Sequence, residues 1–311
     1  MKNVYKLTEG AVFLAIYTVL LLITLYVPVI GAAINYFLPL PFILFSAKYE
    51  LKNSAVFLVA SIVLSFIVGS LLGISLALGF GLTGLITGHL IKKQKSRLVI
   101  FIAASFVFLI NLIVQYVVAV IVFEIDFIAE LMKILRESVD MSIQILSSVG
   151  QKPDSRAIEQ LEARIDVMET LMPSLIVLFS FLNVFFIQLI SMPIARRLGL
   201  KPPKWKPLRE LVLPKSLLWY YLFALIASLL IRPEEGTYWY WALVNLVYIL
   251  QLFMVLQGLS FIFFVSYVKR YSKAVPIFVT ILACLFPFIL YIVRILGIID
   301  LGFNLRQRLI K

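Results

Sequence analysis

The sequence predicts an all-α membrane protein with several transmembrane helices, on three observations. Of the 311 residues, 62% are hydrophobic and only 14% are charged, whereas a soluble chain would carry about 25% charged residues. The mean hydropathy is +1.05. Apolar runs of about 20 residues, enough to cross a hydrocarbon core of about 30 Å, recur along most of the chain. These runs lack the alternation of barrel strands, so each is expected to be a helix that pairs its own backbone polar groups.

The apolar runs predict about nine transmembrane helices, within a range of about eight to ten. Their approximate bounds are 11–30, 31–47, 54–71, 72–91, 98–123, 172–195, 217–231, 238–268 and 274–299. Two arrangements stay open for the last run. We favour a single crossing by 274–299, because halves of about 12 residues are too short to cross. Alternatively, Pro287 divides the run into a re-entrant hairpin that returns the C-terminal tail to the side from which it came.

Three parts are expected along the chain. Residues 1–200 hold the first six spans, 201–216 form a basic linker whose prolines prevent a continuous helix, and 217–311 hold about three more spans. The basic linker suits contact with anionic lipid headgroups, and the alternative is that it docks a cytoplasmic partner.

Within the first part, segment 124–170 predicts an amphipathic helical hairpin because its apolar residues recur at helical spacing. Gly150 and Pro153 separate the two helices, and Asp154 or Ser155 is placed to cap the second. The alternative is that the two helices extend the flanking spans out of the membrane. The apolar residues are Ile128, Leu131, Met132, Leu135, Val139, Ile143 and Leu146, then Ile158, Leu161, Ile165, Met168 and Met172.

Basic residues occur at alternate ends of the predicted spans. Because Lys and Arg beside spans stay in the cytoplasm, the N-terminus is predicted to be cytoplasmic and segment 124–170 external. The net charge of +12 is therefore assigned to membrane topology and not to nucleic-acid binding. The basic positions are Lys2, Lys6, Lys48, Lys52, Lys92, Lys93, Lys95, Arg97, the stretch 196–215, Lys269, Arg270 and Lys273.

Residues for catalysis and metal binding are scarce. His89 is the single histidine and Cys284 the single cysteine, which leaves no set of ligands for a histidine or cysteine metal site. The sequence holds no GxxxxGK[ST] phosphate loop, so the chain is not expected to hydrolyse ATP. We expect a protein that is not an enzyme and that carries no cofactor and no metal.

Amide and acidic side chains at the outer half of spans five and six, with Asn35 between the first two spans, form a candidate ligand-binding site. Asn111 and Gln115 lie one turn apart on the fifth span, and Asn183 lies midway along the sixth. The alternative is structural, since amides also bond between membrane helices with about 1 kcal/mol each. The candidate ligand-binding residues are Asn35, Asn111, Gln115, Glu124, Asp126 and Asn183.

Glycines four residues apart predict close helix packing. Gly69 with Gly73, and Gly84 with Gly88, are spaced so that another helix backbone can approach closely in lipid. The alternative is an irregular turn near Gly79–Gly81 that lines a cavity.

The first 200 residues resemble the six-helix fold of the substrate-binding S-components of energy-coupling-factor vitamin transporters, and the MreD cell-shape proteins are similar in topology. The resemblance rests on Glu9-Gly10-Ala11-Val12-Phe13-Leu14-Ala15, on Pro39-Leu40-Pro41-Phe42 and on the Gly-rich fourth span. It implies a membrane coupling subunit as a partner, and Ala11 and Ala15 match the alanine pair through which S-components contact that subunit. The extra C-terminal spans and the absence of glycine from Lys48–Asn53 differ from S-components.

The whole chain is similar to YybS-type bacterial membrane proteins, a family of unknown function. The similarity includes the ending Gly297-Ile298-Ile299-Asp300-Leu301-Gly302-Phe303-Asn304-Leu305-Arg306-Gln307-Arg308. Genes of that family often neighbour one for a membrane-bound cyclic-dinucleotide phosphodiesterase, which the resemblance implies as a partner. It also implies a multi-pass protein of the bacterial cell membrane.

Two functions are compatible with these observations. One is a solute-binding or transport protein of the S-component type, open to the outer face. The other is a non-catalytic scaffold of the MreD kind that docks partner proteins. A buried, polar-lined cavity would favour the first, and a well-packed six-helix core would favour the second.

Overall fold

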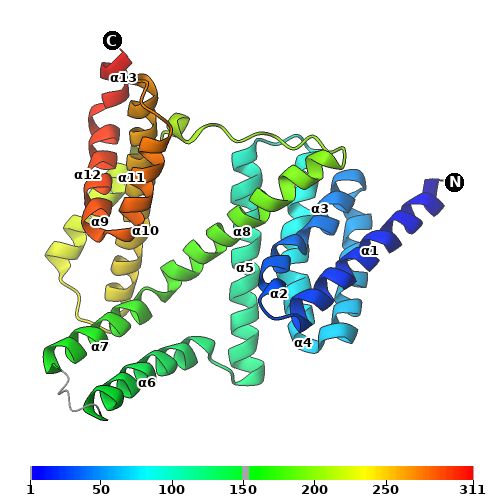
Figure 1. Ribbon diagram of the computed structural model, residues 1–311, viewed down its shortest axis with the longest axis horizontal. Helices are drawn as coiled ribbons and strands as arrows, with labels where there is room; N and C mark the ends of the chain where they lie inside the picture. The colour runs from blue at the N-terminus through cyan, green and yellow to red at the C-terminus, as the bar shows by residue number, and fades with distance from the viewer. Residues whose placement is uncertain (1, 149–153, 311) are drawn as a thin grey trace. The chain divides into compact units, whose positions relative to one another are not determined.

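The computed structural model describes residues 2–148 and 154–310, and within these ranges all regular elements are helical (Figure 1). This confirms the predicted class of polytopic helical membrane protein. The elements up to residue 148 are α1 (Lys2–Tyr26), α2 (Ile30–Ile34), η1 (Asn35–Phe37), α3 (Pro39–Lys48), α4 (Leu51–Lys92), α5 (Arg97–Phe123) and α6 (Phe127–Ser148). The later elements are α7 (Ser155–Thr170), α8 (Met172–Arg197), η2 (Leu208–Glu210), α9 (Ser216–Ile231), α10 (Tyr238–Val268), α11 (Ala274–Leu285), α12 (Pro287–Phe303) and α13 (Leu305–Ile310).

Six helical segments in the described ranges are long and apolar enough to cross a membrane. They are Val4–Tyr26, Ile30–Lys48, Leu51–Lys92, Arg97–Phe123, Met172–Arg197 and Tyr238–Val268. Ser216–Ile231 and Ala274–Leu285 are shorter apolar helices.

Helix α4 is a hairpin and supplies two of the predicted spans. Its 42 residues would extend about 63 Å if straight, twice the hydrocarbon thickness. The backbone leaves helical geometry at Gly69 and Ser70, where Ser70 has a φ of 50°. Beyond this turn Gly73 packs against the backbone of Ser65, and Gly81 faces Leu58. These pairs are equally spaced about the turn, so the two arms run antiparallel, as predicted for 54–71 and 72–91.

The chain divides into two compact units. Unit 1 comprises Met1–Glu130 and Ile176–Trp205, and unit 2 comprises Leu131–Leu175 and Lys206–Lys311. The hairpin segment 124–170 was expected in the first part of the chain, whereas most of it belongs here to unit 2. The expected parts 1–200, 201–216 and 217–311 stay a prediction.

An aromatic cluster packs in the hydrophobic core of unit 1. Phe42 of α3 lies edge-on to Tyr17 of α1 and to Phe57 of α4, with ring centroids 5.0 and 5.1 Å apart. Phe45 stacks on Phe57 at 4.6 Å. Aromatic pairs at these distances add to the dispersion attraction of a dense core. Unit 1 is therefore packed where its first three spans meet.

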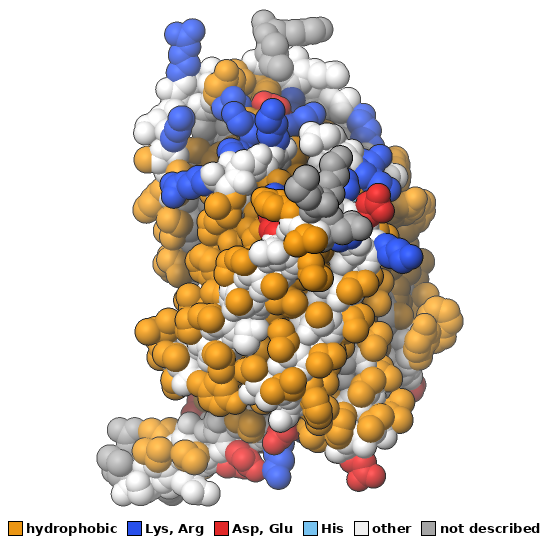
Figure 2. Space-filling model, turned by 90° about the vertical axis from the view of Figure 1, so that its right-hand side faces the viewer, with side chains coloured by type: hydrophobic (Ala, Val, Ile, Leu, Met, Phe, Trp, Pro, Cys, Tyr) orange, Lys and Arg blue, Asp and Glu red, His pale blue; other side chains and the backbone are white. Residues whose placement is uncertain are grey.

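Basic residues from several helices lie together at one end of unit 1. Lys6 Nζ of α1 donates to Asn53 Oδ1 of α4 at 2.9 Å, and Lys92 Nζ donates to the carbonyl of Tyr49 at 2.9 Å. Figure 2 shows Lys and Arg side chains gathered at one end of a broad hydrophobic zone. The basic residues that occur at alternate ends of the predicted spans therefore lie on one side of unit 1.

The helical hairpin of segment 124–170 is present as α6 and α7. Arg136 of α6 donates to Asp166 Oδ1 at 3.1 Å and to Glu169 Oε2 at 3.0 Å, both on α7. Asp154 caps α7 by accepting from the amide of Arg156 at 3.0 Å. Gly150 and Pro153, predicted to separate the helices, lie outside the described residues. The contacts between α6 and α7 favour the hairpin over two independent extensions.

Unit 2 corrects the prediction for the last apolar run. Helix α11 has 12 residues and ends before Phe286, which is extended, and α12 starts at Pro287. A helix of 12 residues is about 18 Å long, too short to cross. Figure 1 shows α11 and α12 side by side as a hairpin. The favoured single crossing by 274–299 is wrong, because Pro287 ends the helical hydrogen-bonding pattern and the tail finds polar partners on the side of the linker.

Candidate functional site

Asn111 and Gln115 bond to each other instead of pointing into an open site. The Gln115 side-chain amide donates to Asn111 Oδ1 and, at 3.0 Å, to the carbonyl of Ser75 on α4. Gly79 lies beside the same two amides, and a Cβ at this position would be 3.5 Å from Asn111 Oδ1. The pair therefore links α5 to the second arm of α4.

Asn183 and Asn35 are placed differently. Asn183 is 8% exposed on α8, and its Oδ1 atom is buried without a hydrogen-bond partner among the described residues. The Oδ1 atom of Asn35 in η1 is likewise buried and unpaired. No hydrogen bond of the described chain joins either side chain to the Asn111–Gln115 pair. The structure thus does not bring the four amides together as one bonded group.

The acidic candidates Glu124 and Asp126 lie where α5 ends and α6 begins. Glu124 is exposed and left-handed, with a φ of 56°. Asp126 Oδ1 accepts from the amides of Ile128 and Ala129 and from the hydroxyl of Tyr116, each at 3.0 Å. The amide of Ala129 is the main group that holds the pKa of Asp126 below its usual value. Asp126 therefore caps α6 through its Oδ1 atom, and its role as a ligand stays a prediction.

The four candidate glycines lie at close contacts inside unit 1. Gly84 and Gly88 face the carbonyls of Pro39 and Ile43, where any Cβ would overlap the backbone of α3. Gly69 and Gly73 lie at the turn of α4: a Cβ on Gly69 would overlap the Leu25 side chain, and one on Gly73 would overlap the backbone of Ser65. The irregular turn of this region is therefore at Gly69–Ser70, whereas α4 stays helical through Gly79–Gly81.

Ala11 and Ala15 lie on the outer surface of α1. Both side chains are exposed in the described chain, and Ala15 lines a shallow apolar depression with Ile16, Val19 and Leu20. The stripe therefore faces away from the spans of unit 1, and it is available to lipid or to a partner helix.

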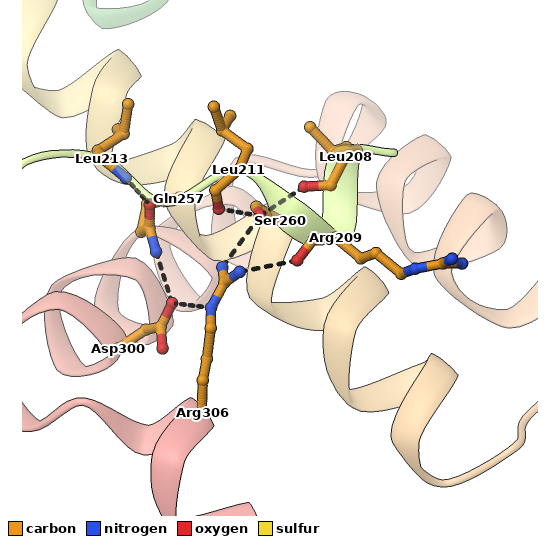
Figure 3. A network of polar contacts seen from close by, with 8 residues as sticks. All are labelled: Leu208, Arg209, Leu211, Leu213, Gln257, Ser260, Asp300 and Arg306. Carbon is orange, nitrogen blue, oxygen red and sulfur yellow. Dashed lines mark hydrogen bonds and ion pairs between the residues drawn. The ribbon is translucent and has the colours of Figure 1, made fainter. Parts of the chain in front are cut away.

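A second polar site, in unit 2, was not predicted from the sequence (Figure 3). Asp300 of α12 is 4% exposed, and its Oδ2 atom accepts from Arg306 Nε at 3.0 Å and from Gln257 Nε2 at 2.5 Å. The Arg306 guanidinium also donates to the Ser260 hydroxyl at 2.9 Å and to the carbonyl of Arg209 at 2.8 Å. One buried ion pair thus joins α10, α12, α13 and η2.

The same network holds the linker. Gln257 Oε1 accepts from the amide of Leu213 at 2.9 Å, and the Ser260 hydroxyl lies 2.7 Å from the carbonyl of Leu208 and 2.6 Å from that of Leu211. These backbone groups belong to a segment with little regular structure, where neither a helix nor a sheet can satisfy them. The side chains of α10 supply their hydrogen-bond partners instead. The network fixes η2 and its neighbours on unit 2.

Two further glycines let this network form. A Cβ on Gly258 of α10 would overlap the carbonyl of Val293, and one on Gly297 of α12 would overlap that of Met254. The two backbones are therefore in direct contact, which brings Gln257 within reach of Asp300. The signal was present in the sequence as an acidic residue inside the ending 297–308, followed six residues later by Arg306.

Comparison with known proteins gives a consistent result. The chain matches the family described as "Predicted membrane protein (DUF2232)" over residues 15–301. It is 31% identical over 309 residues to the uncharacterized protein YybS of Bacillus subtilis (strain 168), covering 99% of both chains. No solved structure is similar to it at a significant level. The chain belongs to the DUF2232 family of predicted membrane proteins.

Proposed function

We propose that this integral membrane protein is a non-catalytic scaffold that docks other membrane proteins. The observation that supports this proposal most is the bonding of Gln115 Nε2 to Asn111 Oδ1 and to the Ser75 carbonyl, which uses these groups to join two helices within the protein. The aromatic packing of Phe42 and Phe57 in unit 1 points the same way. The polar network of unit 2 also bonds internally.

A solute-binding role is the second candidate, and one observation favours it. The buried Oδ1 atoms of Asn35 and Asn183 have no partner among the described residues. Buried polar atoms are rarely left unpaired, so a bound solute is one way to satisfy them.

Replacing Gln115 separates the two functions. Gln115→Leu removes the bonds to Asn111 and Ser75, and we expect a loss of about 1 kcal/mol of stability with no change in bound solute. Gln251→Leu, whose amide makes no hydrogen bond in the described chain, is the matched control. Native mass spectrometry and thermal unfolding in detergent measure both effects. A small molecule that is lost from the folded Gln115→Leu protein, but kept by the control, would establish solute binding instead.

The docking partner is proposed from resemblance. A membrane coupling subunit would use the stripe of Ala11 and Ala15, and a membrane-bound cyclic-dinucleotide phosphodiesterase is the other candidate. Ala11→Leu with Ala15→Leu should release such a partner and leave the unfolding temperature unchanged, because both side chains are exposed. Val12→Leu on the same exposed surface is the control. Retention of the same partner by both variants would exclude this surface.

The proposed location is the bacterial cell membrane with a cytoplasmic N-terminus. After replacement of the exposed Cys284, a cysteine introduced at Ser147 should react with an impermeant thiol reagent in intact cells. A cysteine introduced at Lys204 should not react. The opposite labelling pattern would invert the orientation.

A further inference from the structure

Arg97, the first residue of α5, is a buried cation with no counter-ion among the residues that the structure describes. It is 6% exposed, and among the described residues no carboxylate lies within ion-pair distance of its guanidinium. One of its NH2 groups donates to the carbonyl of Gln188 on α8 at 3.3 Å, and its Nε atom is buried without a partner. Buried charges are normally paired, because an isolated one loses its hydration.

Two buried side chains on the part of α8 that contacts Arg97 are also unpaired among the described residues. Gln188 is 1% exposed, and neither atom of its side-chain amide has a hydrogen-bond partner in the described chain. Ser191, one helical turn further along α8, is fully buried and its hydroxyl is unpaired as well. Arg196, in the last turn of α8, is a second basic residue at this end of the helix. The described surroundings therefore add a second cation and further donors, and no carboxylate within ion-pair distance of Arg97.

The site is bordered by buried apolar side chains and by one aromatic ring. Ile100 and Met192, which follow Arg97 and Ser191 along their helices, pack in a buried apolar cluster. On the other side the indole of Trp205 covers the guanidinium at 5.0 Å from the ring centroid. Trp205 is 41% exposed, so the site reaches the surface of unit 1 beside this ring.

The geometry points to a phosphate group as the ligand. We propose that Arg97, Gln188 and Ser191 bind the phosphate of a phosphate ester at the basic end of unit 1. A guanidinium, an amide and a hydroxyl supply several donors to one tetrahedral anion, and the planar guanidinium suits phosphate oxygens. The Gln188 side-chain oxygen requires a donor, which a hydroxyl group on the ester supplies. Since Arg97 begins a membrane-spanning helix, a phospholipid headgroup and a soluble phosphate ester can both reach it.

Thermal unfolding with defined ligands tests the site. The purified full-length protein is delipidated and titrated with phosphatidylglycerol, with phosphatidylcholine, and with glycerol phosphate. We expect phosphatidylglycerol or glycerol phosphate to raise the unfolding temperature of the wild type. We expect the apparent affinity to fall by about tenfold or more in Arg97→Gln, since a bond to a charged group is lost. Arg197→Gln removes the same charge from an exposed neighbour and serves as the matched control.

The outcomes distinguish a lipid from a soluble phosphate ester, and they show which results would overturn the proposal. Stabilisation by phosphatidylglycerol alone assigns a lipid, and equal stabilisation by glycerol phosphate assigns a soluble ester. Equal losses of affinity in Arg97→Gln and Arg197→Gln, or no stabilisation of the wild type by either compound, would overturn the proposal. Tight binding of an acidic peptide in their place would also overturn it.

A second variant keeps the test decisive if Arg97→Gln does not fold. Ser191→Ala removes an unpaired buried hydroxyl, so the ligand-free protein should be as stable as the wild type or more stable. Its affinity for the phosphate ester should nevertheless fall several-fold. Unchanged affinity in a folded Ser191→Ala protein would contradict the site.

Discussion

The polar interiors of the two units differ in one respect. In unit 2 the buried Asp300, Gln257 and Ser260 bond to Arg306 and to the linker backbone, so each finds a partner. Every unpaired buried side-chain atom found in the described chain belongs to unit 1. These atoms lie on Asn35, Ser46, Thr87, Arg97, Ser105, Asn183, Gln188 and Ser191. A hydrogen-bond network whose members are all paired stabilises the fold. Buried polar groups without partners lower the stability of the fold until a ligand binds them.

The largest effect is expected from breaking the ion pair of unit 2. Arg306→Met leaves the Asp300 carboxylate buried and removes the bonds to Ser260 and the Arg209 carbonyl. Removing one partner of a buried pair costs about 3–5 kcal/mol. Unfolding in detergent by heat or denaturant measures the loss. Arg308→Met, an exposed position on the same helix, should have little effect. A loss of similar size in both variants would show that the network contributes little.

A somewhat smaller effect is expected at the crossing of α10 and α12. Gly297→Ala places a Cβ against the Met254 carbonyl, and the overpacking should cost about 1–3 kcal/mol. Gly302→Ala makes only an ordinary contact at 3.6 Å with Leu218 and serves as the control. Thermal unfolding compares the two variants, and equal stability would mean that the helices separate at no cost.

The smallest effect concerns the cap of α6. Because folding lowers the pKa of Asp126, its contribution to stability is present above the unfolded value of about 3.8 and is lost as the pH falls through the folded value. Asp126→Ala should therefore speed hydrogen exchange at the amides of Ile128 and Ala129 at neutral pH, with little change at acidic pH. Asp140→Ala, exposed in the middle of α6, is the control. Equal exchange in Asp126→Ala and the wild type would contradict the capping role.

Helices and their ends were predictable because they depend on local sequence. Apolar length predicted most spans. Asp154 was one of the two predicted caps, because its side chain bonds an amide only two residues away. The α4 hairpin was also foreseen, since one helix of that length would exceed the membrane thickness. The turn of α11 and α12 at Pro287 was misjudged, because hydrophobic length alone does not show that Arg306 has polar partners on the linker side.

The candidate site was less predictable because side-chain partners come from distant parts of the chain. Asn111 and Gln115 are adjacent on one helix, but the Ser75 carbonyl that completes their bonding is 40 residues away. Asp300 and Gln257 are separated by 43 residues, and their contact requires the glycine crossing of α10 and α12. In the sequence Arg97 was interpreted as a topology signal, and only the structure shows that it is buried with no counter-ion among the described residues.

The contrast between the units is tested most directly by one paired measurement of thermal unfolding on two amide-to-leucine variants. Gln257→Leu in unit 2 removes a donor from Asp300 and leaves the Leu213 amide unpaired, so its unfolding temperature should fall. Asn183→Leu in unit 1 removes a buried oxygen that has no partner, so the ligand-free protein should keep or raise its unfolding temperature. A fall for Asn183→Leu as large as that for Gln257→Leu would contradict the account.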